Sequence, residues 1–246
     1  MMHGSKGVGG VNENSLVTLQ SAIAVQGAPA GADLVATLGY TTQDYDWMVG
    51  YFMSIADFPG SDFQANPGLD PMSGQYGLVQ YQTPHHAEGY LKSPINGDYT
   101  SINYKNSSGE YSQLITGVFQ RTEWSGFLNT PTATFNTAST SNGTIPSLTG
   151  LTRTTGNHTL FVSVMCVYGS QWDGTIVPSG YTNLGQLEQQ DATTAYMTMV
   201  ANYKWVEAGG TRDDNGTETA TGYTAGTVSG TTQFIHLLHK YTSTPV

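Results

Sequence analysis

Apolar residues along this chain alternate with polar ones or form short continuous runs, which is the pattern of β-strands. The clearest run, Thr159–Tyr168, is almost entirely apolar and predicts a strand buried on both faces. Two more long runs follow it at Ala195–Trp205 and Thr231–Tyr241, and the β-branched start of the second favours a strand over a helical turn. Shorter strands are predicted in the first half at 34–38, 47–55, 76–81 and 113–119.

Turn signals separate the predicted strands throughout the chain, among them Pro59-Gly60, Asn96-Gly97 and Asn215-Gly216. This succession of strands and turns is typical of β-sandwiches and jelly rolls. The one stretch with a plausible helical pattern, Leu184–Ala195, is short and poorly periodic. We therefore expect an all-β protein with an antiparallel, jelly-roll-like β-sandwich and two similar halves.

A weak internal repeat underlies the expectation of two halves. Gly97-Asp-Tyr-Thr100 and Gly222-Tyr-Thr224 each precede a small-residue turn and then an apolar strand. The repeat predicts a first β unit at 15–130 and a second at 131–246. The Gly-rich start of the chain predicts an N-terminal arm at 1–14, flexible or docked on a partner. The stretch 129–141 has Phe135 as almost its only large apolar residue, and is expected to be a linker between two units or a crossover within one continuous sandwich.

Composition narrows the class of protein further. The chain has 246 residues, of which 11% are charged and 11% aromatic, and a formal net charge of −10. Few charges with many Thr, Gly and aromatic residues exclude a helical bundle and favour a packed β core. The acidic balance argues against nucleic acid as a partner, and no apolar run is long enough to span a membrane. Cys166 is the single cysteine and is expected to be a core residue.

Several short motifs, from about Ser15 onward, resemble a β-sandwich module of bacteriophage virion proteins and secreted bacterial surface proteins. The motifs are Leu114–Gln120, Ile145–Thr149, Asn157–Val164, Val177–Leu184 and Tyr203-Lys-Trp205. The chain departs from the module at Tyr181, where Trp is usual, and in a Pro/Gly/His-rich insertion in the first half. The resemblance implies a structural or adhesive role at a virion surface and supplies no catalytic residues.

Residue patterns that could support chemistry are sparse. Asp44 and Asp46 are close in sequence, but they lie among loop-forming residues and are expected to be solvated. Neighbours such as His85-His86 point to opposite faces of an extended segment and do not chelate one ion alone. The acidic turn Asp213–Glu218 lacks the spacing of a calcium loop, and His236 and His239 diverge on a strand. We expect no catalytic residue, cofactor or metal ligand.

Exposed aromatic residues offer a different kind of site, because their faces can stack on sugar rings. Trp172, Asp173 and Tyr181 lie near a predicted loop and are the candidates for an exposed contact, whereas Trp47 and Trp124 are expected in the core.

These observations predict a non-enzymatic virion structural protein, such as a capsid decoration or cement protein or a head or tail appendage. Expected partners are identical subunits, in a homotrimer by analogy with other virion appendages, and virion proteins such as the major capsid protein. The alternative is a carbohydrate-recognising adhesin or receptor-binding tail protein that contacts a host surface glycan. Either would act at the virion surface after assembly in the host cytoplasm.

Overall fold

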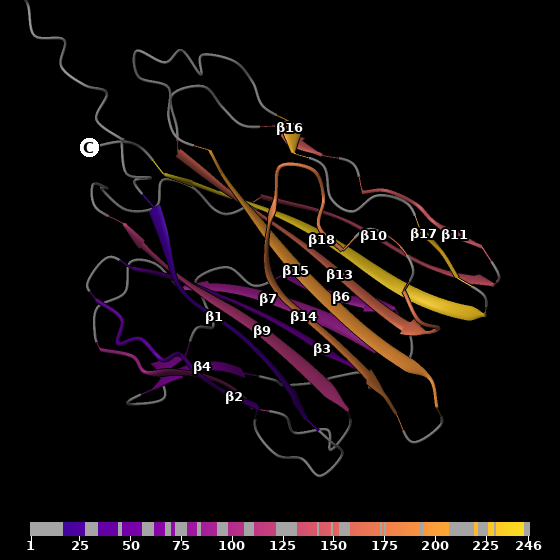
Figure 1. Cartoon of the computed structure of the whole chain (residues 1–246), viewed down its shortest axis with the longest axis horizontal. Helices are drawn as coiled ribbons and strands as arrows, with labels where there is room; N and C mark the ends of the chain where they lie inside the picture. The colour runs from indigo at the N-terminus through magenta and orange to yellow at the C-terminus, as the bar shows by residue number, and fades with distance from the viewer. Residues whose placement is uncertain are drawn as a thin grey trace, which may run out of the picture.

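Antiparallel β-strands make up every regular element that the computed structural model describes (Figure 1). The described residues are 17–27, 34–43, 46–55, 62–66, 70–71, 78–82, 85–92, 98–105, 111–121, 132–141, 143–148, 150–152, 158–172, 174, 176–191, 194–206, 219–220, 226–228 and 230–243. The expected all-β, antiparallel sandwich-like fold is therefore confirmed, whereas the jelly-roll topology stays a prediction.

Two five-stranded sheets form the body of the molecule. Sheet 1 has the order β1 (Val17–Gly27), β9 (Ser112–Arg121), β3 (Trp47–Ser54), β7 (His85–Lys92) and β6 (Leu78–Gln82). Sheet 2 has the order β10 (Thr132–Ser141), β18 (Thr231–Ser243), β13 (His158–Gly169), β15 (Tyr196–Val206) and β14 (Thr182–Gln190). The two sheets lie face to face, with β1 against β14 at one side and β6 against β10 at the other.

Smaller sheets complete the fold. A cover sheet on the far side of sheet 1 contains β2 (Leu34–Thr37), β8 (Ser101–Lys105), β4 (Asp62–Asn66) and β5 (Asp70–Pro71) (Figure 1). The second half of the chain also contains two short two-stranded sheets. In one, β11 (Thr144–Ile145) pairs with β17 (Gly226–Thr227), and in the other, β12 (Leu151–Thr152) pairs with β16 (Thr219–Ala220).

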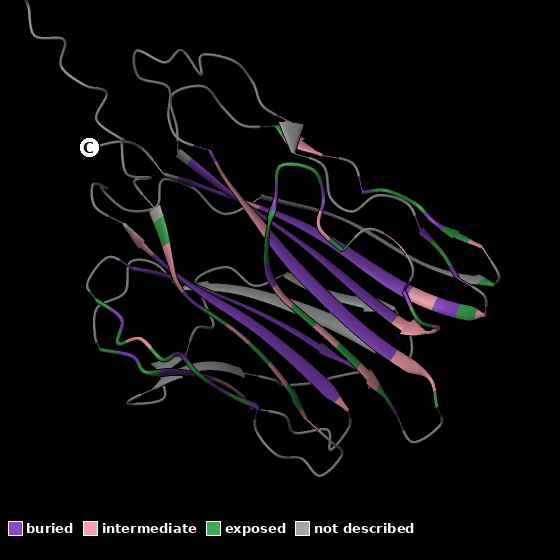
Figure 2. Cartoon of the chain, viewed as in Figure 1, coloured by how far each residue is buried: buried purple, intermediate pink, exposed green. Residues whose placement is uncertain are grey.

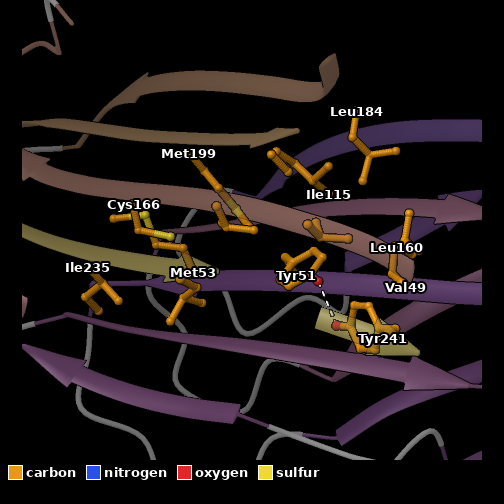
Figure 3. Packing of buried hydrophobic residues seen from close by; sticks show 14 of the residues in the cluster. Val49, Tyr51, Met53, Ile115, Leu160, Cys166, Leu184, Met199, Ile235 and Tyr241 are labelled. Carbon is orange, nitrogen blue, oxygen red and sulfur yellow. Dashed lines mark hydrogen bonds between the residues drawn. The ribbon is translucent and has the colours of Figure 1, made fainter. Parts of the chain in front are cut away.

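The largest hydrophobic cluster lies between sheets 1 and 2 (Figure 3). Trp47, Tyr51 and Ile115 enter it from sheet 1, and Leu160 and Met199 enter it from sheet 2. Because both halves of the chain contribute, the regions 15–130 and 131–246 share one core. Burial of apolar side chains from both sheets stabilises their association by about 25 cal/mol per Å².

Both large sheets are also covered on their outer faces (Figure 2). Met48, Phe52 and Val118 of sheet 1 pack under the cover sheet. Met165 and Phe234 of sheet 2 pack under Ile145, Trp172 and Val228, which follow β10, β13 and β17. Central strands buried on both faces are apolar at most positions, which explains the nearly continuous run in β13.

The two halves repeat one strand order. In each sheet the first strand of the half pairs with its last strand, and that last strand then pairs with the long central strand, β3 or β13. A hairpin follows beside the central strand, β6–β7 in sheet 1 and β14–β15 in sheet 2. The short strands β2 and β8 pair in the first half as β11 and β17 do in the second. The motifs that suggested the repeat precede equivalent strands, β8 and β17.

Two stretches left open by the sequence are resolved as strands. The stretch 129–141 contains the edge strand β10, which pairs with β18 along ten residues from Thr132 to Ser141, so it is neither a linker nor a simple crossover. The helical candidate Leu184–Ala195 is mostly the strand β14, whose residues pair with β15. In both places cross-strand pairing outweighs weak local preferences, because β propensity depends mainly on the surrounding sheet.

Candidate functional site

Trp172 is not an exposed contact residue, contrary to the sequence-based prediction. Its side chain is only 7% exposed and packs in a cluster with Val167 and Phe234 on the outer face of sheet 2. Gly174 and Gly226 lie against the indole ring, where a Cβ at Gly226 would come within 2.7 Å of it. The chain can therefore fold closely over the ring, and Trp172 acts as part of the cover of sheet 2.

Tyr181 is also buried, at 9% exposure, and packs with Leu148 and Phe161 in a second outer cluster. Its backbone N–H donates to the carbonyl oxygen of Pro178, which closes the turn before β14. Asp173, the third residue of the predicted contact, lies outside the described residues. The two described aromatic residues are thus packing residues, because the outer face of sheet 2 is too apolar to stay uncovered.

The buried titratable residues also belong to the packing. Cys166 is a core residue as predicted, and burial raises the pKa of its thiol. His236 and His239 point to opposite faces of β18, since His239 contacts Tyr51 and Tyr241 between the sheets whereas His236 packs against Phe234. Burial lowers the pKa of His236 to about 3 and that of His239 to about 4, so both imidazoles are neutral at pH 7.

A closed hydrogen-bonded triangle joins sheets 1 and 2. The hydroxyl oxygen of Tyr51 lies 2.8 Å from that of Tyr241 and 3.0 Å from Nδ1 of His239, and Tyr241 lies 2.8 Å from the same nitrogen. Burial raises the pKa of both tyrosines, with the neighbouring Tyr241 adding to the effect at Tyr51. All three residues are at most 3% exposed, so the triangle stabilises the sheet interface rather than meeting a ligand.

Asp46 is buried rather than solvated, which corrects a second prediction. It is 1% exposed and accepts hydrogen bonds from the hydroxyl of Tyr40, at 3.0 Å, and the backbone N–H of Gln43, at 2.9 Å. Burial, together with the hydrogen bond to Asp46, raises the pKa of Tyr40 to about 12. Asp46 therefore holds the turn that leads into β3, and Asp44 lies outside the described residues.

This turn places Gln43 beside two other glutamines. Gln20 Nε2 donates to Gln120 Oε1 at 2.8 Å, and Gln120 Nε2 donates to Gln43 Oε1 at 3.2 Å. We call Gln20, Gln43, Gln120 and the half-buried Tyr40 the glutamine cluster. It combines amide donors and acceptors with a tyrosine that is linked to Gln43 through Asp46. The sequence did not predict the cluster because its members come from three separate segments.

The edge strands β1 and β14 form a second surface feature, which we call the edge pair. Within the described residues, neither strand has a neighbour on its outer side. β1 spans 11 residues and contains no charged side chain, and β14 spans nine residues with Glu188 as its single charge. Such an edge presents backbone N–H and C=O groups to another chain.

Other predicted sites lie partly or wholly beyond the described structure. Asp213–Glu218 and the arm at 1–14 lie outside the described residues, and of His85 and His86 only the strand position at the start of β7 is described. Among the described residues, no group of three His, Cys, Asp or Glu side chains gathers closely enough to hold a metal ion. No described helix is long and apolar enough to cross a membrane.

Neither a family model nor a curated protein nor a solved structure matches this chain. The resemblance to phage virion modules therefore rests on the short sequence motifs alone.

Proposed function

We propose that this protein is a non-enzymatic structural component of a phage particle, displayed at the virion surface as a decoration protein or as a head or tail appendage. The observation that supports the proposal is the edge pair, two long edges that lie together on one side of the molecule and carry a single charged side chain, Glu188. Structural proteins of particles must bind neighbouring subunits along extended surfaces. Edges with so few charged side chains allow this at a small desolvation cost, because few ions are buried in the contact.

The partners in this proposal are identical subunits and other virion proteins, such as the major capsid protein. The double-sided burial of sheets 1 and 2 supports it further, because a rigid stack of sheets maintains its shape when its edges bind other chains. No cofactor enters the proposed role.

Purified particles provide the test. Mass spectrometry of the particles should detect the protein at a fixed stoichiometry, and images of particles made with and without it should differ by a defined surface density. Deletion of the arm at 1–14 should weaken attachment to the particle while the melting temperature of the protein stays unchanged. Absence of the protein from purified particles would contradict the proposal.

A second candidate function, glycan recognition by an adhesin or receptor-binding tail protein, is favoured by the glutamine cluster. Amide side chains can hydrogen-bond to the hydroxyl groups of neutral sugars, and the ring of Tyr40, which is linked to Gln43 through Asp46, could contact the apolar face of a sugar. Binding to a panel of neutral glycans should be lost in Gln43→Ala and Gln120→Ala, and retained in the matched variant Gln190→Ala on β14. Failure of the wild-type protein to bind any glycan would contradict this alternative.

A further inference from the structure

The edge pair has a geometry suited to one particular partner, a second copy of this chain. β1 and β14 are stacked on each other across the sandwich, since a Cβ at Gly185 would lie 3.4 Å from Cβ of Ala24 and 2.9 Å from Cγ2 of Ile115. Gly117 of β9 packs closely on Leu184 of β14 as well, since a Cβ added at Gly117 would lie 2.7 Å from Cδ1 of Leu184. The free edges of β1 and β14 therefore lie next to each other, one above the other, on the same side of the sandwich.

Most devices that normally protect an edge strand are missing from both strands. Proteins discourage edge pairing with lysines, prolines, very short strands or bulges, and β1 and β14 contain no lysine and no proline. Each does contain an irregularity, between Leu19 and Ser21 in β1 and between Asn183 and Gly185 in β14. Both irregularities lie near the strand starts, so Ser21–Gly27 and Gly185–Gln190 remain regular and able to pair.

The side chains of β14 complement those of a second β14 in one antiparallel register. Gln186 and Glu188 are exposed on the outer face of sheet 2, opposite Val200 and Thr198 of β15. With a two-fold axis at Leu187, Gln186 of each copy faces Glu188 of the other, since directly opposed residues share a face. Each amide can then donate to a carboxylate. A register centred on Glu188 would instead oppose two carboxylates.

Two hydrogen bonds fix the position of Glu188 on its own molecule. Gln171 Nε2 donates to its Oε1 at 3.0 Å, and the hydroxyl of Thr198 lies 3.4 Å from its Oε2. Each carboxylate oxygen has capacity to accept a further hydrogen bond. The carboxylate is thus held on the outer face of sheet 2, where the amide of a second copy would meet it.

Sheet 1 can take part in the same contact. A two-fold axis that pairs identical strands within one sheet runs perpendicular to that sheet, and because the sheets are stacked it also crosses the plane of sheet 1. The same rotation brings β1 toward β1 of the second copy, and these strands contain no charge to repel each other. Such a contact is closed and isologous, which limits assembly at this edge to two copies.

We propose that two copies of this chain associate through antiparallel pairing of β14 with β14, centred at Leu187, with β1 lying beside its counterpart. The proposal rests on the proposed structural function and replaces the threefold arrangement expected by analogy. It makes the dimer the unit that binds the particle.

Sedimentation analysis of the full chain over a range of concentrations tests the proposal. The wild-type protein should be a dimer. Gln186→Glu places like charges opposite each other twice, and should raise the dimer Kd at least tenfold, by about 1.4 kcal/mol. Gln186→Lys should leave the Kd unchanged or lower it. The exchange variant Gln186→Glu with Glu188→Gln restores the amide–carboxylate pairs and should restore the dimer.

Control variants separate pairing from folding and net charge. Thr144→Glu adds the same charge at an exposed position of β11 and should leave the dimer intact. All variants should share the circular dichroism spectrum and melting profile of the wild-type protein. A wild-type monomer or trimer, or a dimer that is equally insensitive to Gln186→Glu and Gln186→Lys, would overturn the proposal.

Particle binding distinguishes this inference from the proposed function. If the protein occurs on purified particles but is monomeric in solution, the dimer proposal alone fails. If the protein dimerises as proposed but is absent from particles, the structural function fails and the dimer stands.

Discussion

At the residue scale, two glycines with positive φ differ in the space around them. Gly169, at the end of β13, has a φ of 120°, and a Cβ there would overlap the carbonyl oxygen of Thr231. Gly39 also has a positive φ, 63°, but an added Cβ would have no atom within 4 Å. A side chain at Gly39 would meet only the mild strain of the left-handed region, whereas one at Gly169 would meet a more strained φ and a steric overlap as well.

Gly169→Ala should therefore destabilise the protein more than Gly39→Ala does. We expect a loss of about 1 kcal/mol for Gly39→Ala, from positive-φ strain alone, and about 3 kcal/mol or more for Gly169→Ala. Urea unfolding measures both values. Equal losses in the two variants would contradict both the overlap at Thr231 and the additional strain at Gly169.

Buried histidines make stability depend on pH. In the folded protein the pKa of His236 is about 3 and that of His239 about 4, against 6.5 for an unperturbed histidine. Below pH 6.5 the unfolded chain binds protons that the folded chain does not. The free energy of unfolding should therefore fall as the pH decreases from about 6.5 toward 4, by up to about 1.4 kcal/mol per pH unit for each histidine.

The variant His236→Leu isolates one of these protons. Neither ring nitrogen of His236 has a hydrogen-bond partner in the described structure, so leucine should maintain the stability at pH 7. The free energy of unfolding should then fall less steeply with decreasing pH, because the unfolded variant binds one proton fewer. Chemical unfolding at a series of pH values measures this, and an unchanged slope would show that His236 does not titrate as expected.

At the scale of elements, the Tyr51–Tyr241–His239 triangle joins β3 of sheet 1 to β18 of sheet 2. Tyr51→Phe removes one hydroxyl and leaves Tyr241 and His239 bonded to each other. We expect a loss of about 1–2 kcal/mol in unfolding free energy, because a buried hydrogen-bonding group loses its partner. A double-mutant cycle with Tyr241→Phe should give a non-zero coupling energy. Additive losses would contradict a shared network.

At the scale of the whole molecule, the shared core makes the halves interdependent. Separate fragments 1–130 and 131–246 would each expose an apolar sheet face that includes Tyr51 in one and Leu160 in the other. Each fragment alone should therefore aggregate or self-associate, and co-expression should give a stable one-to-one complex. Pull-down with a tag on one fragment measures this. If each fragment instead were a folded, soluble monomer, the halves would fold independently.

Local sequence alone determined the type of element and much of the core. The run Thr159–Tyr168 predicted the buried strand β13, and Cys166 and Met199 lie inside as their neighbours indicated. Trp47 is buried as expected, and the repeated turn motifs preceded equivalent strands. Periodicity carries this information because side chains of a strand alternate between its faces.

Tertiary structure alone decided which positions are covered and which strands are edges. The sequence predicted Trp172 and Tyr181 to be exposed because they lie near a loop. In the structure both residues pack on the apolar outer face of sheet 2, and glycines beside Trp172 allow the chain to approach its ring closely. The glutamine cluster and the edge pair depend on which strands become neighbours. That choice is made by the whole chain, because each pairing is stabilised by contacts between residues far apart in sequence, which no local pattern records.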